Sequence, residues 1–177
     1  MLGLAEIVGG DALRRDWAMS NTPVLRGEVW RLVTAHIVHL SPMHTGLNVL
    51  GLLLMGAALW PVLSASRLMR ACAASGAAIS FGWLALQPAT ASYVGFSGIT
   101  HGLYVFGGLL LLREGPGWFG WLVLGAVSAK LAHEALLGPV PGAEAEIGGR
   151  VSLLSHALGA LGGALAARRG PSVPRWT

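Results

Sequence analysis

Five apolar stretches, each close to the length needed to cross a lipid bilayer, constrain the fold of this chain more than any other feature. They lie at about residues 44–60, 68–86, 97–112, 118–137 and 151–167, and polar or Pro/Gly-rich turns separate them. A helix rising about 1.5 Å per residue needs roughly 17–25 apolar residues to cross ~30 Å of hydrocarbon. The sequence therefore predicts an all-α, polytopic membrane protein with about five transmembrane helices.

Composition supports a membrane protein and excludes several other classes. Hydrophobic residues make up 54% of the 177 positions and charged residues 11%, whereas an ordinary soluble domain carries about 25% charged residues. The net charge of +4 does not indicate a nucleic-acid partner, because the arginines stand singly or in pairs rather than in a basic stripe. Cys72 is the single cysteine, so neither an intrachain disulfide nor a cysteine-based metal cluster can form. We expect no cofactor and no metal.

The chain divides into three parts with different compositions. Residues 1–42 mix charged and apolar side chains and predict an interfacial segment, residues 43–168 form the transmembrane domain, and residues 169–177 form a polar tail. Positive residues are enriched on cytoplasmic loops. Five arginines share one side of the membrane if the chain crosses five times, namely Arg67, Arg70, Arg113, Arg168 and Arg169. We expect an integral protein of the bacterial inner (plasma) membrane whose opposite, outward face holds the active site.

Polar side chains occur near the outward ends of three predicted spans. His44 and Asn48 begin the first span, Ser97 and His101 begin the third, and His156 lies in the fifth. Because one span separates each of these from the next, all three start on the same side and their polar residues share a depth. Intramembrane polar groups are costly, so this coincidence predicts one shared functional site.

Glycines on the same helix faces predict a close contact between the third and fifth spans. Gly98 and Gly102 form one small-xxx-small pair, and Gly159 and Gly163 form another on the face that carries His156. Small residues at this spacing let helix backbones approach closely, which a serine hydroxyl needs to reach a histidine on another helix.

These residues together supply the parts of nucleophilic catalysis. Ser97 stands between Gly95 and Gly98 at a helix start, where backbone N–H groups are unpaired. Ser97 is the predicted nucleophile and His156 its general base.

The sequence also predicts which groups stabilise the oxyanion and whether an acidic residue assists His156. The N–H of Ser97 and the side chains of His44 and Asn48 are predicted to donate hydrogen bonds to the oxyanion. Glu134, at the outer end of the fourth span, is not expected to lie near His156. The sequence therefore predicts a Ser/His dyad rather than a triad.

An ordered set of motifs resembles the rhomboid intramembrane serine proteases. The set comprises Trp30-Arg31-Leu32, His39, His44, Asn48, Gly95-Phe96-Ser97-Gly98 and His156-Ala157-Leu158-Gly159. The resemblance covers about residues 28–165. It implies that Ser97 attacks a peptide carbonyl, that His156 serves as base and then acid, and that His44, Asn48 and the Ser97 N–H form the oxyanion hole.

Within that family the chain looks like a rhombosortase. The features that carry this likeness are His101, four residues after the serine, and the segment Lys130–Pro139. The resemblance implies transmembrane protein substrates with a C-terminal sorting tail, in which a glycine pair precedes a hydrophobic helix and basic residues. A glycine pair suits cleavage because it lowers the cost of unwinding a helical substrate. Transfer of the product to an amine, as in a sortase, and hydrolysis by water both remain open.

The chain departs from the family pattern at two positions. Most bacterial rhomboids have one more core span before the position of Trp30, whereas here that span is missing or is reduced to residues 1–10. Many rhomboids also place tyrosine where His101 stands, beneath the catalytic histidine. His101 is expected either to position His156 or to fill the helix interface.

Other polar residues have two interpretations each. The spacing of His36 and His39 permits a metal site, but with no acid or cysteine pair beside them a loop held by histidine hydrogen bonds is favoured. Lys130 and Glu134 are four residues apart and form either an ion pair at the membrane boundary or a recognition site for the substrate tail.

Two functions from other classes compete with proteolysis. A catalytically inactive rhomboid-like protein would bind transmembrane clients, and retention of Ser97, His156 and both oxyanion side chains argues against it. A small transporter would relay protons through its histidines, but such a pathway predicts acids deep in the spans, and the spans contain none there.

Overall fold

The structure, a computed structural model, describes residues 2–168 of the chain. In chain order its elements are α1 (Leu2–Trp17), β1 (Met19–Ser20), α2 (Asn21–Leu25), α3 (Arg31–Thr34), α4 (Pro42–Leu59), α5 (Ala65–Leu86), β2 (Ser92–Tyr93), α6 (Ser97–Glu114), α7 (Gly117–Leu137), α8 (Ala143–Ile147) and α9 (Leu153–Ala167). The predicted polar tail, residues 169–177, lies outside the described residues.

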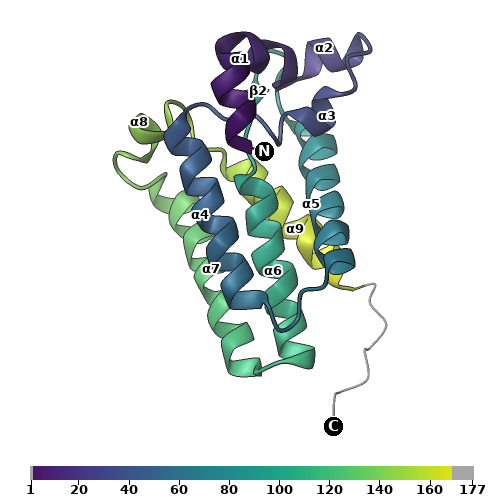
Figure 1. Cartoon of the computed structure of the whole chain (residues 1–177), viewed down its shortest axis with the longest axis vertical. Helices are drawn as coiled ribbons and strands as arrows, with labels where there is room; N and C mark the ends of the chain where they lie inside the picture. The colour runs from purple at the N-terminus through teal and green to yellow at the C-terminus, as the bar shows by residue number, and fades with distance from the viewer. Residues whose placement is uncertain (1, 169–177) are drawn as a thin grey trace.

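Five long helices form a bundle, which confirms the predicted fold class (Figure 1). Helices α4, α5, α6, α7 and α9 coincide with the five predicted spans to within a few residues at each end. Among the described residues, α4 and α5 are long and apolar enough to cross a membrane by length and composition, and α9 is a shorter apolar helix.

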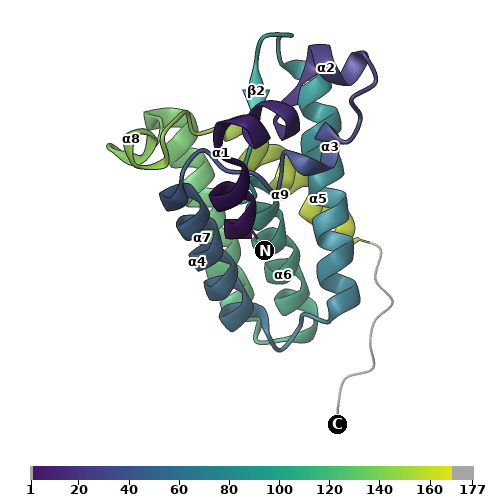
Figure 2. The same cartoon turned by 45° about the horizontal axis from the view of Figure 1, so that its top comes forward.

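The bundle has one end that is covered and one that is not. Helices α4, α6 and α9 all begin near the end where α1, α2, α3, β2 and α8 gather, whereas the turn from α6 to α7 lies at the opposite end (Figure 1). The tilted view in Figure 2 shows the same arrangement. The polar residues at the starts of these three helices therefore lie at the covered end of the bundle.

Serine side chains cap three of the long helices. The side chain of Ser41 accepts from the N–H of His44 at the start of α4, and those of Ser64 and Ser152 do the same for α5 and α9. Such caps satisfy N–H groups that have no partner inside the helix, and each typically contributes about 1 kcal/mol. The capping residues thus fix where α4 and α9 begin, and so fix the height of their first polar side chains.

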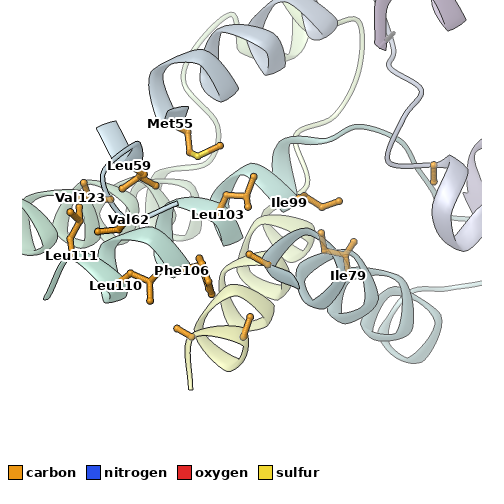
Figure 3. Close-up of a cluster of buried hydrophobic side chains, with 14 of the residues drawn as sticks. Met55, Leu59, Val62, Ile79, Ile99, Leu103, Phe106, Leu110, Leu111 and Val123 are labelled. Carbon is orange, nitrogen blue, oxygen red and sulfur yellow. The ribbon is translucent and has the colours of Figure 1, made fainter. Parts of the chain in front are cut away.

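Helix α6 is the centre of the bundle and packs against α4, α5, α7 and α9. Its side chains Leu103 and Phe106 are fully buried. Figure 3 shows the surrounding apolar cluster, whose labelled members are Met55, Leu59, Val62, Ile79, Ile99, Leu103, Phe106, Leu110, Leu111 and Val123. This core lies mainly below the first turn of α6 and leaves that turn to the polar residues.

Helices α6 and α9 touch through their backbones at two pairs of glycines. A Cβ atom added to Gly159 would lie 1.9 Å from the carbonyl oxygen of Gly98, and one added to Gly163 would lie 2.0 Å from that of Gly102. Both distances are far shorter than any real contact, and the obstructing atoms are backbone. Glycine is therefore required at these positions for the two helices to approach as they do.

The N-terminal segment is fastened across the covered end. Strand β1 pairs antiparallel with β2, with Met19 opposite Tyr93. The guanidinium of Arg31 donates to the carbonyl oxygens of Arg15 and Ala18 at 2.6 and 2.8 Å. Asn21 donates to the carbonyl oxygen of Gln87 at 2.8 Å. The strand pairing and the Asn21 bond tie the segment before α4 to the loop that leads into α6, and the Arg31 bonds hold the segment itself together.

Two histidines between α3 and α4, His36 and His39, are buried. His36 contacts the hydroxyl of Ser80 on α5 at 3.1 Å, and that hydroxyl donates to the carbonyl oxygen of Leu32 at 2.6 Å. His39 is fully buried with its ring edge-on to His44. Burial lowers the pKa of both His36 and His39 from 6.5 to about 4.

We expect Gly159→Ala to destabilise the bundle by about 1–3 kcal/mol or more, because the added methyl meets the α6 backbone, which cannot yield cheaply. Thermal unfolding in detergent micelles, followed by circular dichroism, measures the effect. Gly125→Ala on α7 is the matched control, since nothing lies within 4 Å of its Cβ position. The control should raise stability by roughly 0.5–1 kcal/mol. Equal unfolding midpoints for the two variants would contradict the glycine contact.

The buried histidines predict that stability falls as the pH is lowered from about 6.5 to about 4. In this window the unfolded chain binds protons at His36 and His39, while the folded chain, in which their pKa is about 4, does not. Each histidine should contribute a loss of about 1.4 kcal/mol per pH unit. His39→Phe should make the pH dependence of the unfolding midpoint shallower, and an unchanged slope would show that His39 is protonated at no cost.

Candidate active site

The loop before α6 is shaped by a glycine that contacts α4. Gly95 has a φ of 118°, a conformation that favours glycine, and its N–H donates to the carbonyl oxygen of Ala35 at 2.9 Å. The hydroxyl of Tyr93 donates to the Gly95 carbonyl at 2.6 Å. A Cβ on Gly95 would lie 2.8 Å from Cε1 of His44. The loop is thus held against the start of α4, two residues before Ser97.

Ser97 and His156 meet at the covered end of the bundle. Ser97 is the first residue of α6, and its Oγ lies 2.9 Å from Nε2 of His156 on α9. The side chain of His156 is buried. The contact stands beside the Gly98–Gly159 approach, which brings the two helix backbones close enough for a short serine side chain to reach the ring. The structure therefore brings together the two residues predicted as nucleophile and base.

A third residue joins this pair, and here the sequence prediction is wrong. Glu134 on α7 was expected to lie away from His156, but its Oε2 is 2.7 Å from Nδ1 of the His156 ring. The side chain of Glu134 is only 5% exposed. Because α7 ends at the face where α9 begins, the last turns of α7 reach the same depth as His156. The depth of Glu134 follows from its place near the outer end of the fourth span, whereas its direction toward His156 depends on how α7 packs against its neighbours.

Lys130 lies one helical turn before Glu134 and binds its other carboxylate oxygen. The ammonium of Lys130 forms an ion pair with Oε1 of Glu134, as the four-residue spacing predicts. The side chain of Lys130 is half-exposed and that of Glu134 is buried. The structure thus contains a chain of contacts that runs from Lys130 through Glu134 and His156 to Ser97.

This chain of contacts defines where the protons lie. A carboxylate accepts only, so the short bond between Glu134 and His156 places a proton on Nδ1 of the ring. In the neutral ring Nε2 is then the lone-pair nitrogen and accepts from the hydroxyl of Ser97. The ring is in the tautomer that a general base for Ser97 requires.

His101 lies against the face of the His156 ring. The two ring centroids are 4.1 Å apart and the ring planes are inclined by 16°, a stacked arrangement. Nδ1 of His101 donates to the carbonyl oxygen of Ser97 at 2.8 Å. His101 thus contacts both residues of the pair, one through its ring face and the other through a hydrogen bond.

His44 and Asn48 lie on one face of α4, and both are buried. Nδ1 of His44 accepts from the N–H of Leu40 at 3.3 Å, which leaves the ring proton on Nε2. The amide of Asn48 donates to the carbonyl oxygen of His44 at 2.9 Å. Both residues line the cavity that also holds Ser97.

An open cavity of about 1600 Å³ begins at the covered end of the bundle and continues along α4, α6 and α7 as far as Gly51, Tyr104 and Phe119. Its wall contains the predicted site residues His44, Asn48, Ser97, His101, Lys130, Glu134 and His156. Residues from the N-terminal segment, from the loop before α6 and from α8 complete the rim. The site is therefore reachable, although His156 and Glu134 are themselves buried.

The other predicted positions are structural in this arrangement. Gly98, Gly159 and Gly163 form the contact between α6 and α9. His36 and His39 do not converge on a common point, because one contacts Ser80 and the other packs against His44. Within residues 2–168 no group of three or more potential metal ligands is found.

Comparison with known proteins assigns the chain to a family. A family model described as the Rhomboid domain matches residues 26–170. The search of curated proteins and the search of solved structures each found no match. Members of this family are integral membrane proteins and serine-type intramembrane proteases. The matched region covers most of the chain and includes all the residues of the candidate site, so the chain belongs to the rhomboid family.

Proposed function

We propose that this protein is an intramembrane serine endopeptidase in which Ser97 is the nucleophile and His156 the general base. The observation that carries the proposal is the 2.9 Å contact between Ser97 Oγ and His156 Nε2 in the wall of an open cavity. A hydroxyl at this distance from a lone-pair nitrogen is the arrangement that nucleophilic catalysis needs.

The reaction follows from these contacts. Oγ of Ser97 attacks the peptide carbonyl carbon while Nε2 of His156 takes the hydroxyl proton. The imidazolium then gives that proton to the leaving amine. Water attacks the acyl-enzyme while His156 takes its proton, and His156 returns that proton to Oγ of Ser97 as the acyl bond breaks. If an amine attacks instead of water, the same acyl-enzyme yields a transferred product.

Donors for the oxyanion are available from two helices. The N–H of Ser97 stands in the first turn of α6, where backbone donors have no partner inside the helix. The side chains of His44 and Asn48, which line the same cavity from α4, would supply further N–H donors. One such donor in a soluble protease is worth about 10²–10³ in kcat.

The substrates we propose are transmembrane proteins with a C-terminal sorting tail that contains a glycine pair. The cavity includes the covered end of the bundle, which the positive-charge distribution predicts to face outward from a bacterial inner membrane. A glycine pair would let the tail unwind into this cavity at low cost, whereas an uninterrupted helix would keep its carbonyls hydrogen-bonded. The rhombosortase resemblance supports this choice of substrate.

We expect a fluorophosphonate probe to label the purified protein, and expect Ser97→Ala and His156→Ala to abolish labelling while the protein stays inserted and folded. Ser92→Ala is the matched control, because Ser92 is an exposed serine that lines the same cavity and should leave labelling unchanged. In-gel fluorescence reports the adduct. A wild-type protein that fails to react when another rhomboid does would favour the inactive, client-binding alternative.

A co-expressed substrate with a Gly-Gly tail should be cut at or near the glycine pair, and mass spectrometry of the product gives the cleavage site and any attached amine together.

Asn48→Ala should lower kcat for this substrate by roughly 10²-fold, with a smaller effect on KM, because the hydrogen bond from Asn48 strengthens in the transition state. An intact tail alongside a labelled Ser97 would reject the sorting-tail substrate and retain the protease.

A further inference from the structure

A two-residue Ser/His mechanism leaves the contact between Glu134 and His156 without a role. That contact is nonetheless short, at 2.7 Å, and joins two side chains that are 5% and 6% exposed. Burying a carboxylate is costly unless it is paired and hydrogen-bonded. Glu134 therefore contacts the ring nitrogen of His156 that does not face Ser97, and a mechanism for this site has to account for the contact.

We propose that Glu134 is a positioning residue for His156, so that the site operates as a Ser97–His156–Glu134 triad; this rests on the proposed protease function. Glu134 accepts the Nδ1 proton and thereby turns the lone pair of Nε2 toward Ser97. Its negative charge also stabilises the imidazolium that forms when Ser97 gives up its proton.

His101 and Glu134 constrain the His156 ring in complementary ways. The stacked ring of His101, 4.1 Å away, fixes the plane in which His156 lies. A stack leaves open which ring nitrogen points toward Ser97. The hydrogen bond to Glu134 settles this, because only the nitrogen that carries a proton can face the carboxylate.

Lys130 keeps the carboxylate of Glu134 charged and oriented. Its ammonium pairs with Oε1, which leaves Oε2 for the histidine. Because Lys130 is half-exposed at the cavity wall, its own charge stays partly solvated while it offsets the burial of Glu134. The ion pair predicted from the four-residue spacing thereby holds Glu134 in the orientation in which it contacts His156.

A purely structural role for the contact, as a link between α7 and α9, makes a different prediction from a positioning role. A structural link would be weakened by any change at Glu134, and its loss would lower stability without lowering kcat in the protein that still folds. A positioning role requires an acceptor opposite Nδ1, and requires negative charge for full activity.

The test compares Glu134→Gln, which nearly keeps the shape but loses the charge, with Glu134→Asp, which keeps the charge. For Glu134→Gln we expect kcat to fall at least about tenfold with KM little changed, toward the ~10⁴-fold loss caused by the equivalent change in a soluble serine protease. Glu134→Asp should recover part of the loss. Glu114→Gln is the matched control, because Glu114 pairs with Arg67 at the other end of the bundle and its change should leave kcat unaltered.

Nitrogen-15 NMR of the histidine side chains gives a second readout that does not depend on turnover. The resonances of His156 are assigned by their loss in His156→Gln. The wild type should show a protonated Nδ1 and an unprotonated Nε2, and Glu134→Gln should shift the population away from this tautomer.

The outcomes separate this proposal from the protease proposal. Full activity of Glu134→Gln with an unchanged tautomer overturns the positioning role while Ser97 remains the nucleophile. A wild type that never reacts with a fluorophosphonate overturns the protease proposal. The tautomer measurement still reports whether Glu134 determines which nitrogen of His156 carries the proton. If neither Glu134 variant folds, the wild-type spectrum decides, since a proton on Nε2 would reject the triad.

Discussion

The approach of α6 to α9 at paired glycines is the contact on which the rest of the site depends. Serine has a short side chain, so its hydroxyl reaches a histidine on another helix only if the two backbones almost touch. Gly98 and Gly159 make this possible at the level of the site, and Gly102 with Gly163 repeats it one turn below. Repetition over two turns sets the direction of both helices as well as their separation. The 2.9 Å contact is therefore a property of the helix pair and not of two adaptable side chains.

Much of this arrangement could be predicted from the sequence because lipid simplifies the problem. The apolar stretches gave the helices, and the number of crossings between polar residues placed Ser97, His156, His44 and Asn48 at one depth. Glycine spacing then predicted which helix faces touch. Each step uses a residue spacing or a count of membrane crossings, both of which are visible in the sequence. None of the steps requires knowledge of how the helices tilt and pack.

Glu134 was missed because its position relative to His156 depends on how the helices tilt and pack. Its depth was available from the sequence, since it lies near the end of the fourth span, but its direction toward α9 depends on how α7 packs against α6. The same applies to the segment before α4. Its charged residues predicted an interfacial location. The pairing of Met19 with Tyr93 joins residues far apart in the chain, and no pattern in the sequence indicates that pairing.

The distribution of the site along the chain also matters for its biosynthesis. Ser97 and His156 are 59 residues apart in sequence, and α9 is the last helix of the described chain. A ribosome therefore delivers the serine to the membrane well before its base. During that interval the hydroxyl has no group to remove its proton, and a serine hydroxyl is a weak nucleophile on its own. In the proposed mechanism, therefore, Ser97 gains its general base only when α9 has been made, and a chain inserted no further than α7 would carry no reactive serine.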